Sequence, residues 1–119
     1  PHFQPHPIQG WTPDFIPLVL QEAIDKNLFD ELLPVNGKDS IYWSKQLATK
    51  EGIFTGVSGG ASLAVAMDVA KNAKNGSVIL AMLPDTGERY LSTPLFDDIE
   101  TEMSNEEIEL SKSTPGFQM

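Results

Sequence analysis

The feature that most constrains the fold is a glycine turn between two apolar stretches within residues 53–83. Residues 53–57 predict a short strand, residues 58–60 a tight turn, and residues 61–74 a helix with almost no charge. Because a helix this apolar must be covered nearly all round, it belongs inside a layered fold. The apolar run 77–83 predicts a strand buried on both faces of a parallel sheet. Strand, turn, helix and strand make a βαβ unit, so the sequence predicts an α/β fold.

Two loops follow the predicted strands, at residues 57–60 and 84–87. In open α/β sheets, ligands bind beyond the carboxyl ends of the strands. The first loop opens a helix, whose free N–H groups favour an anion or a polar acceptor. Gly59 and Gly60 would let a ligand ring approach the backbone closely. The alternative is that Ser58 simply caps the start of the helix. The spacing matches neither a dinucleotide fingerprint nor a P-loop.

Helices are also predicted on both sides of this unit. One should run from Pro17 to about Asn27, and another over residues 37–51, because Asn36 and Asp39 have the spacing of a capping box. Gly52 is the expected stop of the second helix. A short helical piece should carry residues 90–96. The remainder, about 97–119, is strongly acidic, and Ser104 followed by Glu107 predicts one more capped helix there.

The charge balance limits the possible partners. Seventeen acidic and eight basic residues give a net charge of −9, which argues against binding to nucleic acid or to an anionic membrane surface. No apolar run approaches the roughly 20 residues of a membrane span. The sequence has no cysteine, so it has neither a disulfide framework nor a thiolate site. No signal peptide is visible, and a cytoplasmic location is expected, or an organelle if a transit peptide is removed.

Three motifs resemble the C-terminal part of cysteine synthase, also called O-acetylserine sulfhydrylase. Residues 51–61 read Glu-Gly-Ile-Phe-Thr-Gly-Val-Ser-Gly-Gly-Ala, and residues 83–93 read Leu-Pro-Asp-Thr-Gly-Glu-Arg-Tyr-Leu-Ser-Thr. Residues 6–10, followed by Phe-Ile-Pro at 15–17, match a third family segment in order and approximate spacing. Three motifs in the right order are more specific than any one of them. The resemblance implies a partial helix and parallel-sheet domain of the fold-type-II pyridoxal-phosphate enzymes, which are similar to tryptophan synthase β.

The resemblance also implies roles for individual residues. Ser58 matches the family serine whose hydroxyl bonds the pyridine nitrogen of pyridoxal 5'-phosphate. A neutral hydroxyl there leaves the ring nitrogen largely unprotonated, which suits β-elimination and addition. The residues expected to line the cleft are Gly10, Gly56, Pro84 and Asp85. For Asp85, a turn-forming or capping role is the alternative. No residue of this chain is expected to be catalytic, and a metal site at His2 and His6 is disfavoured by the surrounding prolines.

The largest departure from the family is a missing lysine. In the family, a lysine in an N-terminal motif forms a Schiff base with the cofactor, and other loops hold the phosphate and the substrate carboxylate. No lysine of this chain lies in a matching context. We therefore interpret residues 1–119 as a C-terminal fragment of the catalytic region, inactive alone and dependent on the remainder of the enzyme. A second departure is residues 11–14, where Trp11 and Pro13 replace small family residues and leave the substrate size preference open.

The expected activity of the complete enzyme is a β-replacement that converts O-acetyl-L-serine and sulfide to L-cysteine and acetate. The resemblance also implies a homodimer. One alternative is another β-replacing enzyme, of the cystathionine β-synthase or O-phosphoserine-dependent type. The other is a non-catalytic acidic binding module that keeps the same shape.

Overall fold

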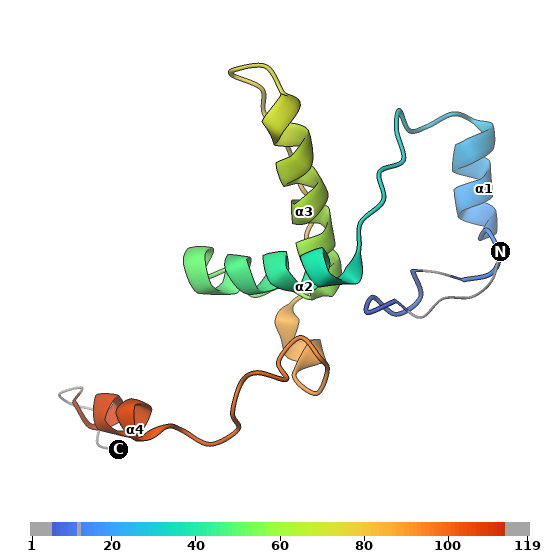
Figure 1. Ribbon diagram of the computed structural model, residues 1–119. Helices are drawn as coiled ribbons and strands as arrows, with labels where there is room; N and C mark the ends of the chain where they lie inside the picture. The colour runs from blue at the N-terminus through green and yellow to red at the C-terminus, as the bar shows by residue number, and fades with distance from the viewer. Residues whose placement is uncertain (1–5, 12, 114–119) are drawn as a thin grey trace.

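The computed structural model describes residues 6–11 and 13–113 (Figure 1). Its elements follow one another along the chain as helices and helical turns joined by irregular segments. They are α1 Leu18–Asp25, α2 Gly37–Gln46, the π-helical turn η1 Leu47–Glu51, α3 Val57–Asn72, the 3-10 turn η2 Gly87–Tyr90 and α4 Asn105–Lys112.

The centre of the molecule is the crossing of α2 and α3 (Figure 1). The two helices pack closely because Gly60 has no side chain: a Cβ there would lie 2.0 Å from the carbonyl oxygen of Ser40. A small core of Ile8, Val57, Ala61 and Leu95 lies against this crossing. The start of α3, where Ser58 lies, is therefore the best packed part of the chain.

The boundaries of α2 follow the prediction. The Asn36 side chain accepts a hydrogen bond from the Asp39 N–H at 2.8 Å, so the predicted cap is confirmed. The helical path continues through the π-helical turn to Gly52, which adopts a left-handed φ of 68° and ends it. Glycine adopts this conformation readily because it has no Cβ, so the predicted stop is confirmed as well.

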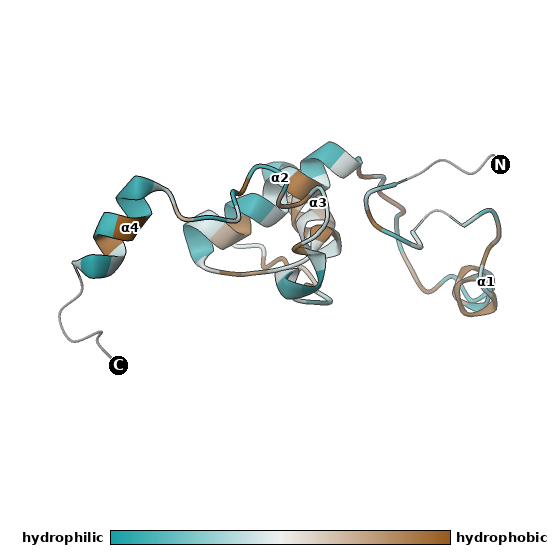
Figure 2. Cartoon of the chain, turned by 90° about the horizontal axis from the view of Figure 1, so that it is seen from below, coloured by the Kyte–Doolittle hydropathy of each residue, from teal (hydrophilic) through white to brown (hydrophobic). Residues whose placement is uncertain are grey.

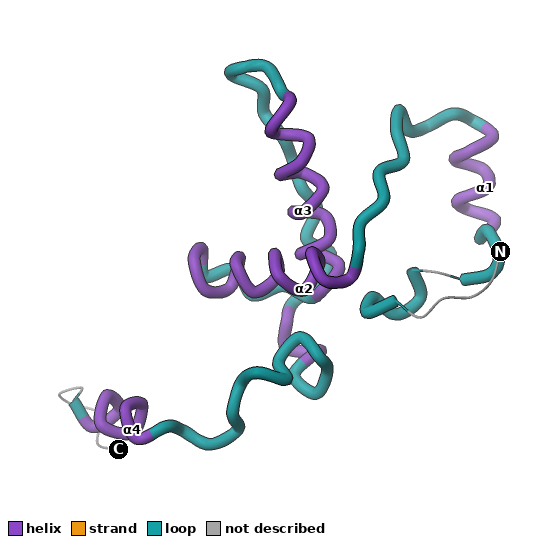
Figure 3. Tube along the Cα trace, viewed as in Figure 1, coloured by secondary structure: helices purple, strands orange, loops and turns teal. Residues whose placement is uncertain are grey.

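The two predicted strands are not formed in the described part of the chain (Figure 3). Residues 53–57 make one antiparallel bridge, between Thr55 and Thr86, and residues 77–83 run alongside α3 without regular structure. The prediction that the second segment is buried on both faces was wrong: Val78 is 96% exposed and Leu80 is 91% exposed. The physical reason is that a strand needs neighbouring strands for its N–H and C=O groups, and the described residues offer none.

The outer helices differ from the predictions only in their limits. Helix α1 is shorter than the predicted 17–27, and Asn27 ends it with a left-handed φ of 51°. Near residues 90–96, the helical piece lies earlier than predicted, at Gly87–Tyr90, and turns follow it. The capping box of α4 is confirmed, because Ser104 and Glu107 bond each other's backbone N–H groups.

The molecule is open rather than compact. Its Cα radius of gyration is 18.8 Å, whereas a compact domain of this length has about 14 Å. Neither α1 nor α4 contains a buried residue. Figure 2 shows α4 as mostly hydrophilic, whereas apolar colour is prominent on α1. The architecture is therefore that of a partial domain, with one packed centre and two exposed ends.

Candidate functional site

The predicted site residue Ser58 is the second residue of α3. Gly56 occupies the N-cap position and no side chain caps the helix, so the alternative in which Ser58 is the cap is wrong. The side chain of Ser58 lies in the packed centre, where the residue is 8% exposed. Its hydroxyl is therefore shielded from water and available for a specific hydrogen bond.

That hydrogen bond joins Ser58 to the loop that follows the second apolar segment. The Ser58 hydroxyl donates to Oδ1 of Asp85 at 3.5 Å, and Tyr90 donates its hydroxyl proton to Oδ2 of the same carboxylate. The Thr55 hydroxyl donates to the backbone carbonyl of Asp85 at 3.2 Å. The two loops that the sequence singled out, 57–60 and 84–87, are thus brought together at the start of α3. We call Ser58, Asp85 and Tyr90 the hydroxyl–carboxylate cluster.

Gly56 makes this cluster possible. A Cβ at residue 56 would lie 2.4 Å from Cε2 of Tyr90 and 2.5 Å from Oδ1 of Asp85. Real Cβ atoms do not approach other atoms so closely, so any side chain at this position would displace the ring or the carboxylate. Gly59 plays a similar part on the other side, because its Cβ would lie 2.0 Å from Oγ1 of Thr55.

The other two predicted cleft residues, Pro84 and Gly10, are exposed. Pro84 precedes Asp85 and is exposed. Gly10 is exposed, has a left-handed φ of 79°, and has nothing within 4 Å of the point where a side chain would begin. The structure therefore brings Gly56 and Asp85 to Ser58, but it shows no contact between Gly10 and the cluster.

Tyr90 and Thr55 are the site residues that sequence reasoning missed. The hydrogen bond to Asp85 raises the pKa of the Tyr90 hydroxyl above its usual 10, and burial adds to this rise. Arg89 opposes it through its positive charge. The proton therefore stays on Tyr90 through the neutral range and holds the carboxylate. The sequence does place Asp85 and Tyr90 five residues apart across a predicted turn. That spacing alone does not predict a contact, because the path of the loop decides whether the two side chains meet.

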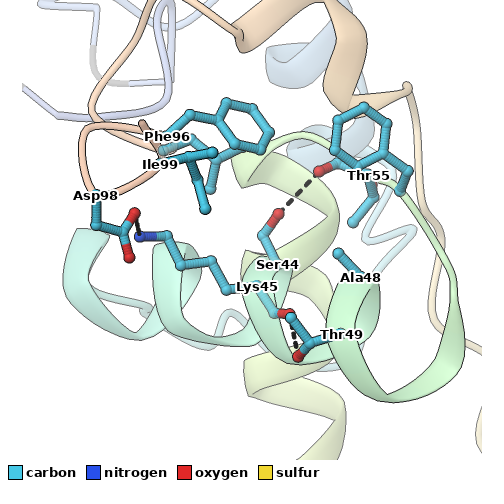
Figure 4. A pocket seen from close by; sticks show the side chains of 10 residues that line it. Ser44, Lys45, Ala48, Thr49, Thr55, Phe96, Asp98 and Ile99 are labelled. Atoms are coloured by element: carbon cyan, nitrogen blue, oxygen red, sulfur yellow. Dashed lines mark hydrogen bonds and ion pairs between the residues drawn. The ribbon is translucent and has the colours of Figure 1, made fainter. Parts of the chain in front are cut away.

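Two of the hollows outside the cluster lie against α2 and α3. The one in Figure 4 lies between α2 and residues 95–99, and its lining is largely apolar. Its polar groups are already engaged: Ser44 bonds the Thr55 carbonyl, and Lys45 pairs with Asp98. The other hollow lies between α3 and residues 79–82, with Trp11 at its edge. Trp11 stacks on His6 with a ring separation of 6.0 Å.

Within 6–11 and 13–113, no group of three or more His, Asp or Glu residues is placed to hold a metal ion. His2 lies outside the described residues. No helix in that part of the chain has the length and apolar character needed to cross a membrane.

Comparisons with known proteins identify the relatives of this chain. No protein-family profile matches it. It is 48% identical over 98 residues to O-ureido-L-serine synthase of Streptomyces lavendulae and 40% identical over 96 residues to cysteine synthase of Buchnera aphidicola. These alignments cover 82% and 80% of this chain, and 29% of each relative. The chain is a cysteine synthase homologue.

Solved structures support the same relationship. A variant of O-ureido-L-serine synthase with O-ureido-L-serine bound superimposes with a TM-score of 0.78 and 42% identity, over 94% of this chain and 34% of that one. Cysteine synthase of Entamoeba histolytica superimposes with a TM-score of 0.63 and 31% identity, over 90% and 30%. These neighbours are fold-type-II pyridoxal-phosphate enzymes, so the predicted fold class is confirmed. This cysteine synthase homologue corresponds to about three tenths of the length of its curated relatives.

Proposed function

We propose that this chain forms part of a pyridoxal-phosphate-dependent enzyme that converts O-acetyl-L-serine and sulfide to L-cysteine and acetate. The observation that carries the proposal is the buried Ser58 hydroxyl at the start of α3, in a chain 38–48% identical to cysteine synthases and O-ureido-L-serine synthase. A β-replacement is the chemistry that cysteine synthase and O-ureido-L-serine synthase have in common.

The donor chemistry of the site fits one edge of the cofactor. The ring nitrogen of pyridoxal phosphate is a hydrogen-bond acceptor when unprotonated, and Ser58 offers a neutral hydroxyl donor on a residue that is 8% exposed. When bound, the cofactor supplies the electron sink that makes the β-substituent of an amino acid replaceable. The residues of this chain would hold and orient the ring, with Ser58 at its nitrogen and Gly56 leaving room for the Tyr90 ring and the Asp85 carboxylate beside Ser58.

A second group is needed to bind the cofactor aldehyde. Four lysines of this chain are paired with carboxylates, and the other three are exposed. No ion pair in the described ranges joins a lysine to Asp85. We propose that the cofactor-binding lysine belongs to the remainder of the enzyme, and that residues 1–119 alone are inactive.

The same remainder would cover the open apolar surface. Along residues 78–82, Val78, Leu80 and Met82 are strongly exposed, whereas the residues between them are less so. This alternation has the period of a strand with one face against α3 and the other without a partner. We propose that strands from the remainder of the enzyme pair with this segment and complete the sheet. Homodimerisation and a cytoplasmic location are further expectations from the family.

The first experiment tests this chain together with the proposed remainder of the enzyme. The polypeptide is expressed with the upstream reading frame that encodes the missing part, and the purified protein is assayed for cysteine formation from O-acetyl-L-serine and sulfide. We expect activity and cofactor absorbance for the complete protein, and neither for residues 1–119. Cofactor binding by the short chain, or a complete assembly without a cofactor-binding lysine, would contradict the proposal.

The second experiment tests Ser58 directly. In the complete enzyme, Ser58→Ala should change the cofactor absorbance and slow turnover, because the ring nitrogen loses its donor. Ser62→Ala, one turn further along α3, is the matched control. Unchanged spectra and rates for Ser58→Ala would remove the assignment.

A second candidate function is the formation of O-ureido-L-serine. The 48% identity and the TM-score of 0.78 to O-ureido-L-serine synthase favour it. The structure of that product implies hydroxyurea as the nucleophile. The deciding experiment supplies O-acetyl-L-serine with sulfide or with hydroxyurea and compares kcat/KM for the two nucleophiles. A hydroxyurea value above the sulfide value would replace cysteine formation as the proposed function.

A further inference from the structure

The carboxylate of Asp85 is shared by two hydroxyl groups from different segments. Ser58 donates to one oxygen at 3.5 Å, and Tyr90 donates to the other. A strong hydroxyl–carboxylate bond has an oxygen separation of about 2.5–2.7 Å. The bond from Ser58 is therefore at its weak limit, and Asp85 is held mainly by Tyr90.

Neighbouring residues hold the Asp85 carboxylate closer to Tyr90 than to Ser58. Thr55 holds the backbone carbonyl of Asp85 at 3.2 Å, and the Thr86 segment is tied to Thr55 by the antiparallel bridge. The ring of Tyr90 lies over Gly56, where a Cβ would be 2.4 Å from it. The carboxylate is thus held from the backbone side by Thr55 and from the other side by Tyr90.

The raised pKa of Tyr90 fits this arrangement. Its hydroxyl keeps its proton because the hydrogen bond to Asp85 and partial burial both disfavour the phenolate. Tyr90 therefore remains a donor to Asp85 over the pH range in which amino-acid chemistry takes place.

The consequence concerns the proton of Ser58. To bond an unprotonated ring nitrogen, the Ser58 hydroxyl must turn its proton away from Asp85 and towards the ring. A carboxylate free of Tyr90 would bind that proton more tightly, and its negative charge would favour a proton on the ring nitrogen instead.

We propose that Asp85 competes with the cofactor ring for the Ser58 hydroxyl proton, and that Tyr90 weakens this competition by holding the carboxylate, so that Ser58 remains a donor to the ring. The inference rests on the proposed function, because it requires a ring nitrogen at Ser58. Asp85 and Tyr90 act through Ser58 and need not touch the cofactor.

The test uses the complete enzyme loaded with cofactor labelled with ¹⁵N in the ring. Tyr90→Phe should move the ring-nitrogen chemical shift towards the protonated value, because Asp85 is released. Asp85→Asn should not move it in that direction. Adding Tyr90→Phe to Asp85→Asn should then produce no further shift. Tyr42→Phe, at the only other tyrosine of this chain, is the matched control and should leave the signal unchanged.

Other outcomes would overturn the inference. A Tyr90→Phe shift that persists in the Asp85→Asn background would show that Tyr90 does not act through Asp85. An unchanged shift in Tyr90→Phe would show that neither residue sets the Ser58 donor. If Ser58→Ala also leaves the signal unchanged, the proposed function fails as well, whereas a Ser58→Ala response alone removes only this inference.

A second measurement does not require turnover. In a Tyr42→Phe background, ultraviolet titration of the complete protein follows the tyrosinate of Tyr90 in this chain, after subtraction of the signal from the protein that carries both Tyr42→Phe and Tyr90→Phe. Asp85→Asn should lower the pKa of Tyr90 towards its usual value, because the main cause of its rise is removed. An unaltered titration would show that Asp85 does not hold Tyr90.

Discussion

The hydroxyl of Ser44 donates a 2.8 Å hydrogen bond to the backbone carbonyl of Thr55, and both residues are buried. Ser44 lies on α2, whereas Thr55 lies in the segment that leads into α3. Thr55 in turn donates its own hydroxyl proton to the carbonyl of Asp85. This chain of contacts connects the packed centre to the hydroxyl–carboxylate cluster, so the position of Ser58 depends on the crossing of the two helices.

Replacing Ser44 tests this connection. Ser44→Ala leaves the buried Thr55 carbonyl without its side-chain donor, and we expect the free energy of unfolding to fall by about 1–3 kcal/mol. The measurement is urea unfolding of the complete protein. Ser111→Ala is the control, because it removes an exposed hydroxyl with the same 2.8 Å bond to a backbone carbonyl. Equal effects at the two serines would show that the buried bond adds nothing.

The close approach of the helices leads to a prediction at Gly60. An alanine in a helix is favoured over glycine by about 1 kcal/mol. Against this, the new Cβ would lie 2.0 Å from the Ser40 carbonyl oxygen and 2.6 Å from the Ser44 nitrogen. Both are backbone atoms that cannot rotate away, and overpacking costs about 1–3 kcal/mol or more. We therefore expect Gly60→Ala to lower the melting temperature. A melting temperature that rises would mean that α2 and α3 are further apart than the structure has them.

The capping box of α4 predicts a pH dependence. Bonds from the Ser104 backbone and side chain lower the pKa of Glu107 below its usual 4.5. A lowered carboxyl pKa stabilises the folded helix above the ordinary value, and this contribution is lost as the pH falls through the lowered value.

Nuclear magnetic resonance can follow this loss at α4. The amide signal of Ser104, whose N–H donates to Glu107 at 2.7 Å, should change on acidification below about pH 4.5, and the α4 signals should lose helical character with it. In Glu107→Gln the acid transition should disappear from Ser104, while in Glu106→Gln it should remain. Persistence of the transition in Glu107→Gln would assign it to another acid.

The exposed strand-like segment predicts different behaviour in the short and the complete proteins. Val78 is 96% exposed here, so Val78→Thr should change the stability of residues 1–119 by less than about 0.5 kcal/mol. In the complete enzyme, the same change would bury a hydroxyl in an apolar layer and cost about 1–3 kcal/mol. Thermal unfolding of both proteins makes the comparison. The same small effect in both would mean that the remainder of the enzyme does not cover Val78.

Local features were predictable because neighbouring residues decide them. Asn36 and Asp39 lie three residues apart, as do Ser104 and Glu107, and each pair caps a helix without help from the rest of the chain. Gly52 ends a helix because its own backbone tolerates a left-handed φ. The strand at 77–83 was mispredicted for the opposite reason: an apolar run reflects the environment of a complete sheet, and the described residues provide no partner strand for it.

The site divides in the same way. The motifs around Ser58 and Asp85 were visible in the amino-acid order, because a glycine-rich helix start and a loop after an apolar run can be read locally. Their contact, the capture of the Asp85 carboxylate by Tyr90, and the need for glycine at 56 were decided by tertiary structure. Ser58 and Asp85 are almost thirty residues apart in the sequence, so the amino-acid order does not place their side chains next to each other. Their separation in space is set only when α2 and α3 pack.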